Sequence, residues 1–88
     1  MTKYIVIFSG EANITKVKDS SNEYLFDTFE YAREVMIEDL YEELSNSYPD
    51  DESIENAKEN NWNEHLDNGW METSNGSEYA WQIIAIEV

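Results

Sequence analysis

The chain has 88 residues, with 20 Asp and Glu against five Lys and Arg, so its formal net charge is −15 at pH 7. The absence of cysteine excludes a disulfide scaffold, a thiolate zinc site and a cysteine nucleophile. The negative charge excludes direct binding to nucleic-acid phosphates, which needs clustered Lys and Arg, and no apolar run approaches the roughly 18–20 residues of a membrane span.

The first predicted element is a buried strand at residues 3–9, an apolar run rich in β-branched and aromatic residues that ends at a glycine. Its apolar part, residues 4–8, is shorter than the roughly 7–15 residues of a secretory signal core, so we expect a cytoplasmic protein. Residues 13–18 predict a short edge strand, residues 19–22 a turn, and residues 23–26 one more short strand.

A long amphipathic helix is predicted next. Asp27 fits the N-cap of a capping box, with Glu30 three positions later to reach back to it. Apolar residues then recur at spacings of three and four, which places them on one arc of a helical wheel, facing a sheet. These residues are Phe29, Ala32, Met36, Ile37, Leu40 and Leu44. We expect the helix to end near residues 44–46.

A second, shorter helix is predicted after Pro49. Asp50 suits its N-cap position and further acids occupy its first turn, where the helix dipole favours negative charge. Ile54 and Ala57 give it a thin apolar stripe as far as about Asn60. The polar residues 60–69 are expected to be irregular.

A C-terminal hairpin completes the chain. An Asn-Gly pair after residues 70–74 predicts a two-residue type I′ turn, and this register places Trp70 opposite Trp81. The final strand, residues 80–88, is apolar on both faces near its end, which is typical of a central strand. We therefore pair it with residues 4–8.

These elements predict an α+β fold: a small antiparallel sheet made by the N-terminal strand and the C-terminal hairpin, with the long helix packed across it and a short second helix. Three Trp, six Tyr and three Phe are spread along the chain and supply buried area that a disordered chain would lack. We expect residues 1–88 to form a single domain.

Motifs for catalysis or cofactor binding do not emerge from the sequence. His65 is the only histidine and has no metal-ligand spacing around it, no serine lies in a Gly-x-Ser-x-Gly elbow, and the three glycines are isolated. We therefore expect neither an enzyme nor a cofactor. The acids near Asp50 lack the alternation and central glycine of a calcium loop, so a cation-binding protein is only a third hypothesis.

The charge pattern is the informative feature. Between Asp27 and Glu72, fifteen acids face two cations, a net charge of −13 within 46 residues. Four acids repeat every four residues along the predicted long helix, and two others form a second row. They are Glu30, Glu34, Glu38 and Glu42, with Asp39 and Glu43 beside them. Together they give one charge per about 3.3 Å of helix axis, close to the roughly 3.4 Å of one DNA strand.

Helix stability alone would not select this pattern. Opposite charges at i,i+4 stabilise a helix by roughly 0.2–0.5 kcal/mol and like charges destabilise it by a similar amount, and all i,i+4 pairs among these acids are like pairs. Such a stripe suits a positively charged groove, most often one that holds DNA or RNA. Tyr31 and Tyr41 lie near the acidic side of the helix and are candidate anchors for the contact.

In size, charge and acidic helix the chain resembles the small acidic inhibitors that phages and mobile elements use against host nucleic-acid enzymes, which include anti-CRISPR, anti-restriction and DNA-glycosylase-inhibitor proteins. Such inhibitors have unrelated folds, so the resemblance implies no particular fold. It implies a non-enzymatic DNA mimic that binds a basic nucleic-acid-binding protein such as a nuclease. We expect the chain itself to be a monomer or a weak homodimer. The predicted partner-binding residues are Glu30, Tyr31, Glu34, Glu38, Asp39, Tyr41, Glu42, Glu43, Asp50, Asp51, Glu52 and Glu55. The alternative is an acidic interaction module or accessory subunit whose charge serves solubility and partner choice.

Overall fold

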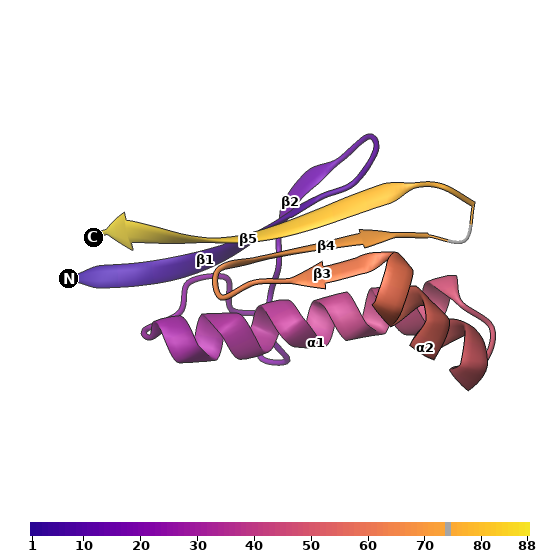
Figure 1. Ribbon diagram of the computed structural model, residues 1–88. Coiled ribbons are helices and arrows are strands. Elements are labelled where there is room, and N and C mark those ends of the chain that lie inside the picture. Colours follow the sequence, from indigo (N-terminus) through magenta and orange to yellow (C-terminus); the bar gives the residue numbers. More distant parts are fainter. Residues whose placement is uncertain (74) are drawn as a thin grey trace.

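The computed structural model describes residues 1–73 and 75–88 and places two helices on one side of a five-stranded antiparallel sheet (Figure 1). The strands are β1 (Thr2–Ser9), β2 (Ile14–Lys16), β3 (Trp62–Glu64), β4 (Asn68–Glu72) and β5 (Glu78–Glu87), and the helices are α1 (Phe29–Ser47) and α2 (Asp51–Asn60). The strand order is β2-β1-β5-β4-β3. The predicted α+β class, with one long helix across the sheet and one short helix, is confirmed.

The core lies between α1 and one face of the sheet. β5 is the central strand and pairs with β1 along eight residues, as its apolar character predicts. Because side chains alternate along a strand, Val6, Trp81 and Ile83 all point toward α1, and each is buried. They pack in one cluster with the predicted apolar arc of α1, of which Ala32, Met36, Leu40 and Leu44 are fully enclosed.

The two helices begin close to where the sequence predicts. The N-cap of α1 is Thr28, whose hydroxyl accepts from the backbone N–H of Tyr31 at 3.2 Å, so the prediction of Asp27 is wrong by one residue. Asp27 pairs with Lys3 instead. Asp50 caps α2 as predicted. Of the helices in the described part of the chain, none is long and apolar enough to cross a membrane.

The C-terminal hairpin differs from the prediction by one residue of register. Trp70 lies opposite Ala80, so Trp70 and Trp81 occupy opposite faces of the sheet. The cause is a longer connection: the N–H of Thr73 donates to the carbonyl of Ser77 at 2.7 Å. Gly76, at φ 92°, supplies the left-handed position that such loops require.

Two segments with weak sequence patterns also differ from their predicted structure. The strand predicted at residues 23–26 is reduced to a single bridge between Tyr4 and Phe26. Residues 60–69 were expected to be irregular but contain β3, a three-residue edge strand. Pairing with β4 holds β3 in an extended conformation although its polar sequence does not favour a strand.

Candidate protein-binding surface

One row of glutamates follows the solvent side of α1, and we name this row the Glu ridge. Its members are Glu30, Glu34, Glu38 and Glu42, all exposed. Neighbours in the row are about 6 Å apart along the helix axis. Within the described residues, no ion pair joins any of them to a Lys or Arg. The one cation of α1, Arg33, donates instead to Glu64 of β3 at 2.8 Å. Within residues 1–73 and 75–88, no paired cation therefore neutralises the Glu ridge.

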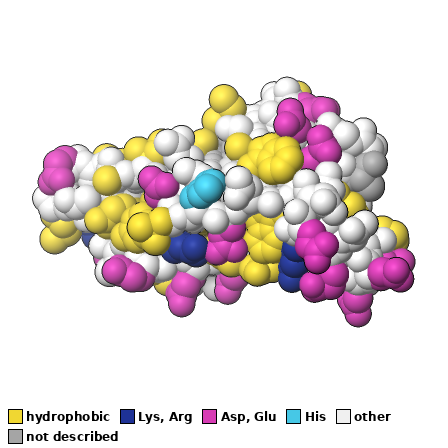
Figure 2. All heavy atoms as spheres, viewed as in Figure 1, with side chains coloured by type: hydrophobic (Ala, Val, Ile, Leu, Met, Phe, Trp, Pro, Cys, Tyr) yellow, Lys and Arg dark blue, Asp and Glu magenta, His cyan; other side chains and the backbone are white. Residues whose placement is uncertain are grey.

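More acids follow on α2. The exposed acids of this helix are Asp51, Glu52, Glu55 and Glu59. Asp50 accepts a hydrogen bond from the N–H of Ser53 at 2.8 Å, which lowers the pKa of its carboxyl. Lys58, the one cation of α2, lies 3.5 Å from Glu55 and 5.2 Å from the ring centroid of Tyr41. In Figure 2 the Asp and Glu side chains gather along the lower edge of the molecule, over both helices.

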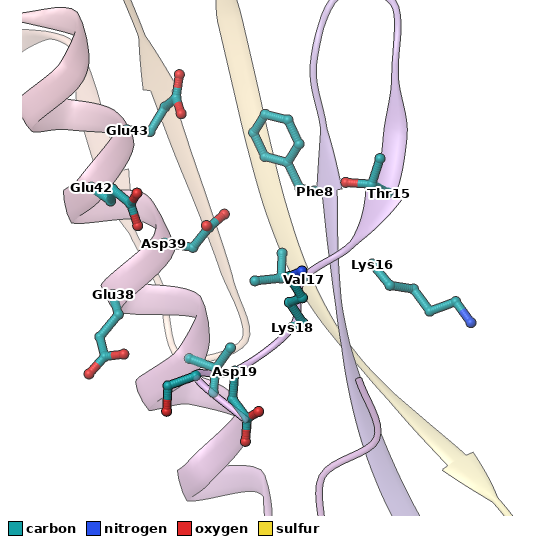
Figure 3. Close-up of a pocket in the computed structure, with 12 residues that line it drawn as sticks. Phe8, Thr15, Lys16, Val17, Lys18, Asp19, Glu38, Asp39, Glu42 and Glu43 are labelled. Atoms are coloured by element: carbon teal, nitrogen blue, oxygen red, sulfur yellow. The ribbon is translucent and has the colours of Figure 1, made fainter. Parts of the chain in front are cut away.

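Asp39 and Glu43 lie beside the Glu ridge, on its sheet-facing side. Both point toward the strands, into a groove of about 540 Å³ between α1 and the β1–β2 hairpin (Figure 3). Asp39 accepts a hydrogen bond from the indole N–H of Trp81 at 2.8 Å. Burial raises the pKa of Glu43, and the carboxylates of Asp39 and Glu42 raise it further. The exposed ridge alone thus has one charge per about 6 Å, roughly half the density of a DNA strand.

The two candidate anchors, Tyr31 and Tyr41, are 41% and 40% exposed, and contacts within the chain hold both of them. The hydroxyl of Tyr31 donates to Asp19 at 2.8 Å, and its ring packs edge-on against Phe26. The ring of Tyr41 packs edge-on against Trp62, with 4.9 Å between the centroids. Each tyrosine presents a fixed edge to solvent, so a partner would meet it without ordering it first.

An apolar groove adjoins the Glu ridge on the side of β3 and β4. Phe29 and Ile37 of α1 and Leu66 of the β3–β4 loop form its apolar lining, and its volume is about 780 Å³. Its rim consists of Glu30, Arg33, Glu34 and Glu38. Leu66 is 70% exposed, and an exposed apolar side chain beside charged groups is typical of a protein contact.

The sequence does not predict this groove, because tertiary packing brings Leu66 to α1. The available signal was weak: Leu66 is an isolated apolar residue in the polar stretch 60–69. Among residues 1–73 and 75–88, no group of three or more His, Asp or Glu side chains is placed to hold a metal ion. His65, the only histidine, is exposed.

Comparison of the chain with protein-family models, with curated proteins and with solved structures found no match. The function is therefore inferred from the Glu ridge, the acids of α2 and the apolar groove.

Proposed function

We propose that this protein is a non-enzymatic inhibitor that mimics the phosphate charge of a nucleic acid. It acts in the cytoplasm of a bacterial host and occupies the basic groove of a DNA- or RNA-binding protein such as a defence nuclease. The Glu ridge carries the proposal, because its four exposed carboxylates have no ion pair within the described residues. Their mutual repulsion destabilises α1, and a cationic partner would offset that repulsion.

The shape of the surface supports this function. The ridge extends over about 18 Å of a helix whose opposite side is packed into the core, so the backbone positions that carry the four glutamates are fixed before binding. The acids of α2 add negative charge that the ridge alone lacks. Binding would release the counterions that surround these acids, the same effect that makes DNA binding sensitive to salt.

The apolar groove supplies the buried apolar contact that a row of carboxylates cannot make. Charged surfaces mainly accelerate association, whereas buried apolar and aromatic contacts determine how long a complex lasts. Leu66 lies beside Ile37 and close to Glu34. It is therefore placed to be buried in a partner while the Glu ridge contacts the cations of that partner. The proposed contact therefore combines a charged row with one apolar anchor.

Retention of proteins from a bacterial lysate tests the proposal. The immobilised wild-type chain should retain a nucleic-acid-binding protein that duplex DNA displaces, because both compete for the same groove. The double variant Glu34→Lys/Glu38→Lys should lose this retention. The matched control Glu11→Lys/Glu23→Lys makes the same change of net charge at exposed positions outside the ridge and should retain the protein.

The outcomes separate the proposal from its alternative. Retention that survives the ridge double variant, or that duplex DNA does not displace, contradicts nucleic-acid mimicry. If retention is instead insensitive to salt and is lost in Leu66→Ala, the apolar groove alone binds the partner. That result favours an interaction module whose acidity serves solubility.

A further inference from the structure

The sheet has a second face, which neither helix covers. Both helices lie on the same side of the sheet (Figure 1), and α1 contacts β1, β4 and β5 from that side. Residues that alternate with the buried core positions point the other way. The apolar residues of this open face are Ile5, Ile7, Ile14, Trp70, Ile84 and Ile86.

The open face is not part of the core. Ile5, Ile7, Trp70 and Ile86 do not belong to the described core cluster or to the partly buried side chains packed against it. Ile84 is 37% exposed and Ile14 is 76% exposed. Ile5 lies directly opposite Ile84, with Ile7 and Ile86 next to them along the two strands, and an apolar group of this kind on a chain so rich in charge is typical of a surface that another molecule covers.

The size of this face suits a small interface. β1 and β5 are eight and ten residues long, but β4 has five residues and β2 and β3 have only three each, so the sheet is five strands wide at one end only. With about 3.3 Å per residue and about 4.8 Å between strands, the footprint is about 460 Å², and two such faces together come close to the roughly 1,000 Å² at which specific interfaces begin. An interface at this limit predicts a weak complex.

Charge distinguishes the open face from the rest of the surface. The register places two cations on it, Lys16 and Lys3, of which Lys3 is paired with Asp27, and the only acids that β4 and β5 direct to it, Glu72 and Glu78, stand at the hairpin end. The helices, with the Glu ridge, lie on the opposite side. Two copies that meet through their open faces keep their ridges apart and pointing outward, whereas contact through the helices would oppose many carboxylates.

We propose that the open face binds a second copy of this chain, giving a weak two-fold dimer with sheet packed on sheet. Such packing is the usual way in which two sheet faces bury apolar side chains. The outermost strands, β2 and β3, are only three residues long, so their edges offer few backbone groups to a second sheet. This dimer is independent of the proposed function, since it leaves the Glu ridge and the apolar groove free.

Salt dependence gives the dimer a clear signature. Each copy has a net charge of −15, so salt that screens this repulsion should strengthen the dimer. Salt should instead weaken the binding of a partner to the Glu ridge. Sedimentation velocity should therefore give a larger dimer fraction at about 1 M salt, where the Debye length is about 3 Å, than at about 0.1 M.

Two matched lysine variants locate the interface. Ile84→Lys places a charge near the middle of the open face and should reduce the dimer fraction at least about tenfold. Leu66→Lys makes the same change of charge on the helix side and should leave the dimer fraction unchanged. The dimer is overturned if the wild-type chain stays monomeric at about 1 mM and high salt, or if folded Ile84→Lys associates as the wild type does.

If Ile84→Lys does not fold, two single-cysteine variants test the same interface by disulfide cross-linking between copies. Gln82 is exposed on the open face at the middle of β5, next to Ile84 along the strand, and the chain has no cysteine of its own. Oxidised Gln82→Cys should form far more disulfide-linked dimer than Glu34→Cys on the Glu ridge. Equal yields from the two variants would remove the open face as the interface.

Discussion

Replacing one glutamate of the Glu ridge by lysine should make the protein more stable. Glu34 has a like-charged neighbour four residues away on each side, Glu30 and Glu38. Glu34→Lys converts two repulsive pairs of about 0.2–0.5 kcal/mol into attractive pairs of similar size, a gain of about 1–2 kcal/mol for the free energy of unfolding. Lys and Glu have similar helix propensities, so this gain reports the charge interaction.

Urea denaturation at low salt measures this gain, which thermal unfolding should report as a rise in Tm of about 4–8 °C for each kcal/mol. The gain should shrink at about 1 M salt, where these exposed charges are screened. Glu11→Lys, in the loop between β1 and β2, changes net charge equally without ridge neighbours and should gain less. If Glu34→Lys is no more stable than Glu11→Lys, the ridge is not repulsive, and no external cation is needed to explain it.

Three further predictions concern the interior. Asp39→Ala should lower stability by about 1.5–3 kcal/mol in urea, because the buried indole N–H of Trp81 loses its acceptor; Asp39→Asn, which keeps an acceptor, should lose less. Gly69→Ala should lower stability by about 1–3 kcal/mol, because its Cβ would lie 2.6 Å from Cδ1 of the fully buried Leu40; an unchanged Tm would contradict this. Glu43→Gln should stabilise the protein near pH 7, because the raised pKa of Glu43 in the folded state means that ionisation of this carboxyl destabilises the fold. The gain should disappear below the ordinary Glu pKa of about 4.3, where the carboxyl is protonated in both states, and a gain that persists in acid would rule out this cause.

Local pattern was sufficient to predict the elements that carry strong periodicity. The apolar spacing from Phe29 to Leu44 located α1 and its buried side, and the apolar faces of β5 placed it at the centre of the sheet. Local pattern failed at segments whose structure is determined by pairing with another strand. The register of Trp70 depends on how Thr73 and Ser77 close the loop, and β3 forms only because β4 offers it a partner.

The candidate surface was predictable to a similar extent. A four-residue repeat keeps side chains on one side of a helix, so the spacing alone predicted the row from Glu30 to Glu42. The same wheel places Asp39 and Glu43 on the arc that contains Met36 and Leu40, which is the signal that they turn inward. Charge counting alone treated all six acids as equivalent, whereas helix geometry separates exposed carboxylates from those that serve the fold.

The two proposed interfaces use opposite sides of the molecule and opposite signs of charge dependence. The Glu ridge should bind a basic partner most strongly when salt is low, because counterion release would drive the contact. The open face should pair most strongly when salt is high, because repulsion between two chains of charge −15 is then screened. A single titration of ionic strength, read by sedimentation with and without a basic partner, therefore distinguishes them. If both associations changed in the same direction with salt, the acidic helices and the apolar sheet face would not be independent surfaces, and the division of this chain into a charged side and a pairing side would be wrong.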